Sequence, residues 1–129
     1  MDSRLKAMTE DAAKVIDAYV AKHGDQVVMS RAEIMSLLDK NGVQTSDWWL
    51  VSDHCYNHYN KGLKDFETDI HLFEYVAPGK YRLLGSHSRY KGKIIWYTKK
   101  NGKMVHVVVG MVTDGVPKLW DESKYYETV

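Results

Sequence analysis

The chain has 129 residues, of which 44% are hydrophobic and 27% charged, values that fit one globular domain and exclude a disordered chain. Its net charge of +1 indicates no class of partner, and the single cysteine, Cys55, excludes an internal disulfide framework. No apolar run approaches the ~18 residues of a membrane-spanning helix and no signal-peptide core is apparent, so we expect a cytoplasmic protein.

The first element predicted along the chain is a helix over residues 5–22. Its apolar stripe repeats at three- and four-residue spacing and consists of Leu5, Met8, Ala12, Val15 and Tyr19. Gly24 is placed to end this helix. The apolar run over residues 27–29 then predicts a short strand.

A second helix is predicted to begin at Ser30, because Ser30 and Glu33 have the spacing of a capping box. Ile34, Leu37 and Leu38 form its apolar side, and Gly42 closes it. A third helix is expected from Ser52 or Asp53, both good N-cap residues, to Lys61-Gly62. Within it, we expect Cys55 and Tyr56 to belong to the core.

The second half of the chain reads as antiparallel strands. Residues 69–75 and 81–84 flank Pro78-Gly79, the central pair of a type II turn. Residues 93–99 and 103–109 flank Asn101-Gly102, a strong hairpin signal. Asp114-Gly115 marks a further turn, and Pro117 predicts that the strand over residues 116–120 lies at a sheet edge.

Positive charge is concentrated in this strand-rich half. Between Tyr75 and Thr113 there is no Asp or Glu, whereas eight basic residues occur there: Lys80, Arg82, Arg89, Lys91, Lys93, Lys99, Lys100 and Lys103. Such a segment attracts polyanions and speeds their encounter with the protein. The alternative is a lysine-rich face that serves solubility alone.

The chain resembles a winged helix-turn-helix domain over about residues 10–86. The segments that carry the resemblance are SRAEIMSLL (residues 30–38), SDHCYNHYNKG (52–62) and HLFEYVAPGKYRL (71–83). The last two also resemble small uncharacterised bacterial and phage domains found near restriction and other defence genes. The fold that this implies is α+β within one domain, with a winged-helix-like part over residues 1–86 and a β-meander extension over residues 87–129.

This resemblance implies DNA binding by the third helix and the hairpin, or wing. The helix would offer His54, Asn57, His58 and Lys61 to bases and phosphates, and the wing would offer Lys80 and Arg82. The remaining contacts would come from the meander: Arg89, Lys91, Lys93, Lys99, Lys100 and Lys103, with Tyr90, Trp96 and Tyr97 available for stacking on single strands. The alternative for Asn57 and Asn60 is that they cap or bridge backbone groups in an irregular turn and do not read bases.

No catalytic or metal-binding pattern stands out. His54 and His58 are four residues apart, but no second ligand pair follows at zinc-site spacing, so we expect no metal and no other cofactor. Neither a phosphate-binding glycine loop nor a nuclease-like carboxylate set occurs, so we expect no enzyme.

Two functions follow from the sequence. The first is non-enzymatic nucleic-acid binding, with DNA as the expected partner and affinity from phosphate neutralisation. The second is a protein-binding module, such as a phage-type inhibitor of the anti-CRISPR kind, whose basic face docks on an acidic or nucleic-acid-binding protein. Homodimerisation through the first helix or Leu119-Trp120 is left open.

Overall fold

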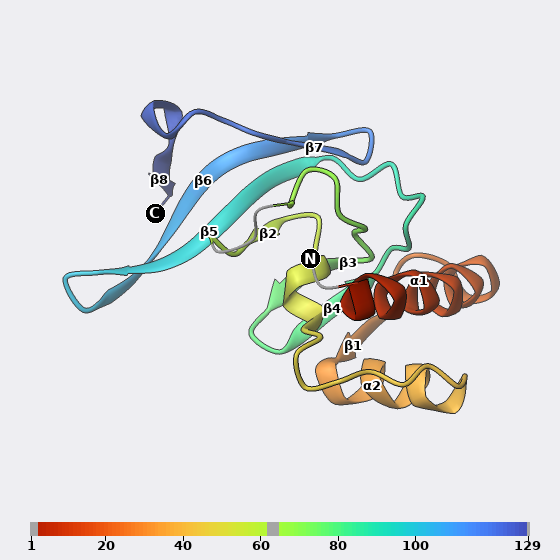
Figure 1. Ribbon diagram of the computed structural model, residues 1–129. Coiled ribbons are helices and arrows are strands. Elements are labelled where there is room, and N and C mark those ends of the chain that lie inside the picture. The colour runs from red at the N-terminus through yellow and green to blue at the C-terminus, as the bar shows by residue number, and fades with distance from the viewer. Residues whose placement is uncertain (1–2, 62–64, 129) are drawn as a thin grey trace.

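The computed structural model describes residues 3–61 and 65–128, which form two helices and two antiparallel-rich sheets (Figure 1). The first predicted helix is confirmed as α1 (Ser3–His23), whose buried side includes Ala12 and Ile16. It ends as expected, because Gly24 adopts a φ of 82° and donates its amide to the Val20 carbonyl oxygen at 2.8 Å.

The second predicted helix is also confirmed. It follows strand β1 (Val28–Ser30) and spans Arg31–Lys40 as α2. The Glu33 amide donates to Ser30 Oγ at 3.1 Å, and the Ser30 amide donates to Glu33 Oε1 at 3.0 Å, which completes the capping box. Buried Ile34 and Leu38 turn this helix toward the core.

The third predicted helix is wrong. The segment instead forms a short 3₁₀ turn, η1 (Val51–His54), and strand β2 (His58–Tyr59); Gly62, its predicted end, lies outside the described residues. Between them Cys55 is extended and Tyr56 and Asn57 form a turn; the Leu72 amide donates to the His54 oxygen and the Tyr56 amide donates to the Phe73 oxygen, each at 2.8 Å. Pairing on both sides outweighs the weak helix propensity of these residues.

The winged helix-turn-helix fold class is therefore wrong. Among the residues that the structure describes, no recognition helix follows α2, and the hairpin predicted as a wing belongs to a three-stranded sheet of order β1-β4-β3. In that sheet β3 (Phe73–Ala77) and β4 (Lys80–Leu83) meet at Gly79, whose φ is 73°. The hairpin itself is confirmed.

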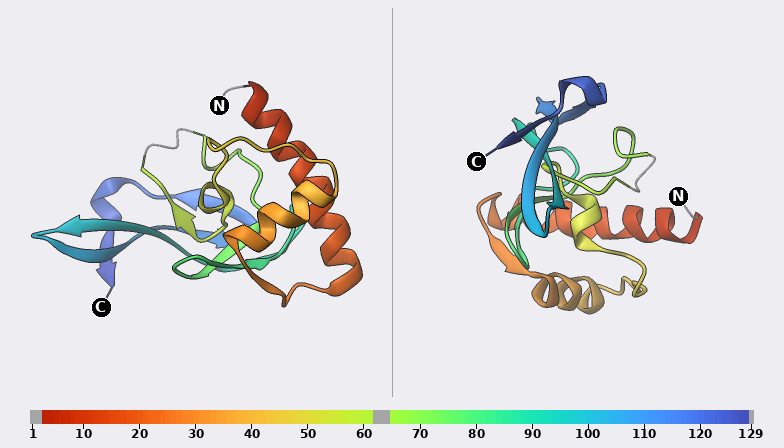
Figure 2. Two further views of the ribbon diagram at one scale, coloured as in Figure 1. Left: turned by 90° about the horizontal axis from the view of Figure 1, so that it is seen from below. Right: turned by 90° about the vertical axis from the view of Figure 1, so that its left-hand side faces the viewer.

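The second sheet has five strands and is strongly curled (Figures 1 and 2). Its path is β2-β5-β6-β7, formed with β5 (Gly92–Lys100), β6 (Lys103–Thr113) and β7 (Val116–Leu119). After η2 (Glu122–Lys124), strand β8 (Tyr126–Thr128) also pairs with β6. A register shift between Ile94 and Ile95 marks a bulge, which increases strand twist and bending.

Two hydrophobic clusters hold these layers together. One lies between the helices and the three-stranded sheet and contains Trp49, Leu72 and Phe73; the other lines the curled sheet and contains Tyr56 and Ile94. Cys55 and Tyr56 are buried in the core, as predicted. Among the described residues, no helix combines the length and apolar character needed to cross a bilayer.

Candidate nucleic-acid interface

The β5–β6 hairpin, called the arm below, projects from the body of the protein (Figures 1 and 2). Asn101 and Gly102 turn the chain with φ values of 53° and 77°, as a type I′ turn requires. Among the described residues, β2 pairs with the arm at Ile95 and Trp96, and β8 pairs with it from His106 to Val108. The outer part of the arm is therefore a two-stranded ribbon.

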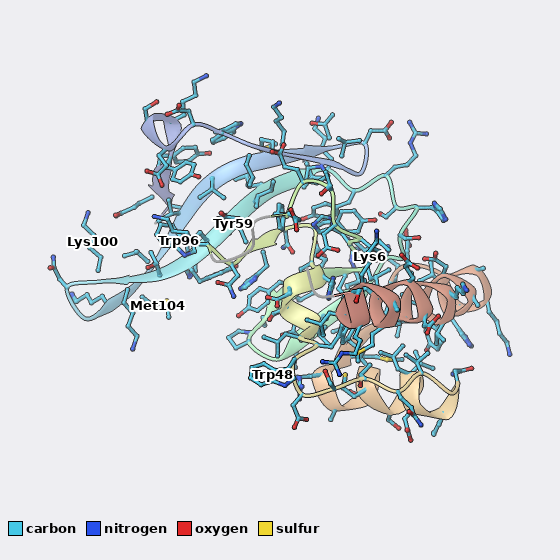
Figure 3. All side chains as sticks on the ribbon, in the orientation of Figure 1. Lys6, Trp48, Tyr59, Trp96, Lys100 and Met104 are labelled. Carbon is cyan, nitrogen blue, oxygen red and sulfur yellow. The ribbon has the colours of Figure 1, made fainter. Side chains whose placement is uncertain are left out.

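The arm has two distinct faces, because side chains alternate along a strand and paired residues share a face. The packed face carries Trp96 and its partner Val107, which lie over the second hydrophobic cluster with Tyr59. The opposite, open face carries Tyr97, Lys99, Met104 and His106 at its outer end. Figure 3 shows Tyr59 beside Trp96, with Lys100 and Met104 on opposite sides of the arm near its tip.

A row of four rings runs from the three-stranded sheet onto the open face. It consists of Tyr75, His58, Tyr97 and His106, and is called the aromatic row. The Tyr75 centroid lies 5.0 Å from His58 and 5.1 Å from Tyr97. Tyr97 stacks on His58 at 5.2 Å and meets His106 edge-on at 4.5 Å.

Partial burial keeps the inner rings of this row uncharged at neutral pH. Burial lowers the pKa of His58, against the opposing effect of Asp53. Burial also raises the pKa of the Tyr75 and Tyr97 phenols. The inner row is thus a neutral aromatic surface, and charge comes from the lysines around it.

Four of the predicted basic residues lie on the arm, and all four are exposed: Lys93, Lys99, Lys100 and Lys103. Lys100 pairs with Glu127 at 3.0 Å, and the Lys93 ammonium lies 5.9 Å from the centre of the Tyr126 ring. Lys99 and Lys103 form no ion pair with the residues that the structure describes. They offer the arm's free positive charge at its tip.

The remaining predicted basic residues are dispersed. Lys80 is exposed on β4, and Lys91 is exposed just before β5. Arg82 is held by Glu74 at 2.9 Å and donates to Gln26 at 3.3 Å, while Arg89 pairs with Asp114. The two arginines are thus engaged by neighbouring side chains.

The residues assigned to a recognition helix are not presented as one surface. His54 is buried under Trp49, with ring centroids 4.9 Å apart, whereas His58 belongs to the aromatic row. Lys61 lies over Trp96 at 4.9 Å and pairs with Glu122 at 3.4 Å. Of the predicted helix face, the structure places only His58 beside the open face of the arm.

Asn57 has a structural role that joins the two sheets. Its Nδ2 donates to the Tyr75 oxygen at 3.0 Å, and its Oδ1 accepts from the Tyr75 amide at 2.8 Å. Its own backbone oxygen accepts from the Ile95 amide at 2.9 Å. One residue therefore links β3 to β5 and places Tyr75 beside Tyr97.

Replacing Asn57 with alanine is expected to lower the free energy of unfolding by about 2 kcal/mol, because two hydrogen bonds are lost and the Tyr75 backbone groups are left without partners. Urea denaturation measures this change. Exposed Asn60 is the matched control, and its replacement with alanine is expected to change stability by less than about 0.5 kcal/mol. Equal effects at the two positions would contradict the role of Asn57.

His54 is buried and is engaged by neighbouring groups. His54 Nδ1 lies 3.1 Å from the Ile70 carbonyl oxygen and 3.8 Å from Asp69 Oδ2. Burial lowers the pKa of His54, although Asp69 opposes this effect. Among the residues that the structure describes, no three His, Cys, Asp or Glu side chains are placed to hold a metal ion.

Two members of the aromatic row were missed in the sequence. The pairing of Tyr97 with His106 follows from a two-residue turn at Asn101-Gly102, since counting outward from the turn sets the register. No sequence signal places Tyr75 beside Tyr97, because these residues belong to different sheets.

The fold and the arm define a two-sheet protein with a projecting basic hairpin, and comparison supplies its family. Residues 11–119 match the family described as Domain of unknown function (DUF7225), and the chain belongs to it. The uncharacterized protein YnaC of Bacillus subtilis (strain 168) is 35% identical over 96 residues, which cover 74% of this chain and 35% of YnaC. This chain thus spans about a third of that relative. No solved structure matches the chain.

Proposed function

We propose that the protein binds nucleic acid through the arm, without catalysing a reaction. The observation that supports this proposal best is the charge of the arm: its two strands contain Lys93, Lys99, Lys100 and Lys103 but no Asp or Glu. A projecting ribbon with this composition can approach a phosphate backbone without an acidic neighbour in either strand. Glu127 of β8 offsets Lys100 alone.

Affinity on this proposal comes from neutralising phosphates, and it falls as salt competes for them. Fluorescence anisotropy with labelled DNA across a salt series measures this dependence. If three or four lysines engage phosphates, log K is expected to fall against log salt with a slope of about −3 to −3.5 for a duplex and about −2 to −3 for a single strand. No binding at low salt would overturn the proposal.

Reversing the charge of Lys99 and Lys103 together, as Lys99→Glu with Lys103→Glu, is expected to weaken DNA binding at least ~10-fold at low salt. Lys6→Glu with Lys14→Glu is the matched control, because it makes the same charge change at exposed sites on α1, a helix that lies away from the tip of the arm (Figure 1). Equal losses in both double variants would assign the effect to net charge, not to the arm.

A protein partner is the second candidate, and the exposure of Trp48 favours it. This side chain is 82% exposed and borders a hollow of about 460 Å³ with Leu5 and Met8 of α1. Exposed tryptophan is typical of protein contact sites. If nucleic acid binds to the arm, Trp48→Ser leaves DNA binding unchanged. Loss of DNA binding in that variant would place the DNA contact at the hollow and not on the arm.

A further inference from the structure

We propose that the open face of the arm binds single-stranded DNA, with unpaired bases stacked against the outer end of the aromatic row. This inference rests on the proposed nucleic-acid binding and specifies its ligand. Exposed His106 and half-buried Tyr97 form the outer end of the row. Stacking on aromatic rings needs bases whose faces are free, and a duplex does not offer them.

Lysines flank the rings on the same face of the arm. Along β5, Lys93, Tyr97 and Lys99 point to one side, because strand residues two apart share a face. The six-residue interval from Lys93 to Lys99 spans about 20 Å, which accommodates a few nucleotides. Charge at both ends and rings between them match a strand that alternates phosphate and base.

The open face carries no carboxylate among the strand residues that form it. On β6 its members from the tip inward are Met104, His106 and Val108, and the paired residues of β8 are Thr128 and Tyr126. Glu127, the acidic residue of β8, is paired with Val107 of the packed face. A phosphate chain along the open face therefore meets no opposing charge from these strands.

The other aromatic residues considered for stacking are engaged. Trp96 belongs to the packed face, where Lys61 covers its ring at 4.9 Å. Tyr90 packs against Tyr56 with ring centroids 5.7 Å apart. Tyr97 is thus the aromatic residue of β5 that lies on the open face, in contact with the neutral ring of His58.

The bound strand is assigned as DNA because neither base stacking nor phosphate pairing requires a 2′-hydroxyl group. Among the rings and lysines of the open face, the oxygen acceptors are the phenols of Tyr97 and Tyr126. A protein ligand would not need the alternation of charge and rings. Both RNA and protein are therefore treated as outcomes that the experiment distinguishes.

The test compares a labelled oligothymidylate, a duplex of mixed sequence and an oligouridylate by fluorescence anisotropy at low salt. The expected result is binding of oligothymidylate at least ~5-fold tighter than binding of the duplex. Equal or tighter duplex binding would overturn the inference but keep the proposed function. Oligouridylate binding ~10-fold tighter than oligothymidylate binding would overturn the assignment to DNA.

Variants of two rings test the stacking step. Tyr97→Leu and His106→Ala are each expected to weaken oligothymidylate binding ~5-fold or more, whereas Tyr97→Phe stays within ~2-fold of the wild type because the ring is retained. His106 is exposed, so its variant tests the row even if Tyr97→Leu is unstable. If the Lys99 and Lys103 reversals weaken oligothymidylate binding but neither ring variant does, the stacking step is overturned while the proposed function is kept. Failure of every nucleic acid to bind would overturn the proposed function as well.

Discussion

Replacing Trp49 with alanine is expected to lower the free energy of unfolding by about 3–5 kcal/mol, the loss typical of a fully buried tryptophan. Trp49 is 1% exposed in the cluster between the helices and the three-stranded sheet. Its Nε1 donates to Thr9 Oγ1 at 2.9 Å, and its ring stacks on His54 at 4.9 Å. The substitution therefore removes packing, a buried hydrogen bond and the cover of His54 together.

Trp48 is the matched control for this experiment, since it is the adjacent tryptophan and is 82% exposed. Trp48→Ala is expected to change stability by less than about 0.5 kcal/mol. Urea denaturation of both variants, with equal slopes against denaturant, isolates the difference in stability. A loss of similar size at both positions would show that the two rings do not differ in burial as described.

Sequence reasoning succeeded where the determining contacts are local. The capping box at Ser30 and Glu33 acts across three residues, and it placed the start of α2 correctly. The same holds for Asn101-Gly102, whose positive φ values fix the turn of the arm. Pro117 likewise predicted an edge strand, and β7 lies at the edge of the curled sheet.

The sequence-based predictions were wrong where contacts with distant segments decide the local structure. The segment from His54 to Tyr59 has N-cap residues before it and was predicted as a helix. In the fold it is inserted between strands, with Cys55 bridging to Phe73 and β2 pairing in parallel with β5. These partners lie far along the chain, and no periodicity within the segment indicates them.

The candidate site shows the same division. The concentration of lysine between Tyr75 and Thr113 was visible in the sequence, and part of it falls on the arm. The rings that accompany those lysines are the ones on the same face of the sheet. Alternation along a strand assigns that face only when the pairing register is known. Tyr75, the neighbour of Tyr97 from the other sheet, is held in place by Asn57. This contact depends on the tertiary structure and has no local sequence signal.

Acidification below about pH 6.5 is expected to destabilise the protein through His71. This residue is 5% exposed and packs against Phe66 and Tyr56, with ring centroids 4.6 Å and 5.4 Å away. Burial, with a smaller effect of His54, lowers its pKa from the ordinary value of 6.5 to about 4. The unfolded chain therefore binds a proton in a pH range where the folded protein does not.

The sign and size of the effect follow from this difference. The stabilising contribution is complete above about pH 6.5 and is lost as pH falls toward 4, by about 3 kcal/mol in total. Burial also lowers the pKa values of His54 and His58, which adds to the loss. Burial raises the pKa of Asp69, so its protonation in the folded state offsets part of the loss at the acidic end.

Urea denaturation across this pH range measures the slope, and His71→Leu tests its origin. Leucine suits a site bordered by Phe66 and does not titrate, so this variant is expected to lose stability less steeply on acidification than the wild type. His87→Gln is the control, since the His87 side chain is 92% exposed. Equal slopes for wild type and His71→Leu would assign acid sensitivity to other groups. A rise in stability on acidification would mean that Asp69 protonation dominates the pair it forms with His54.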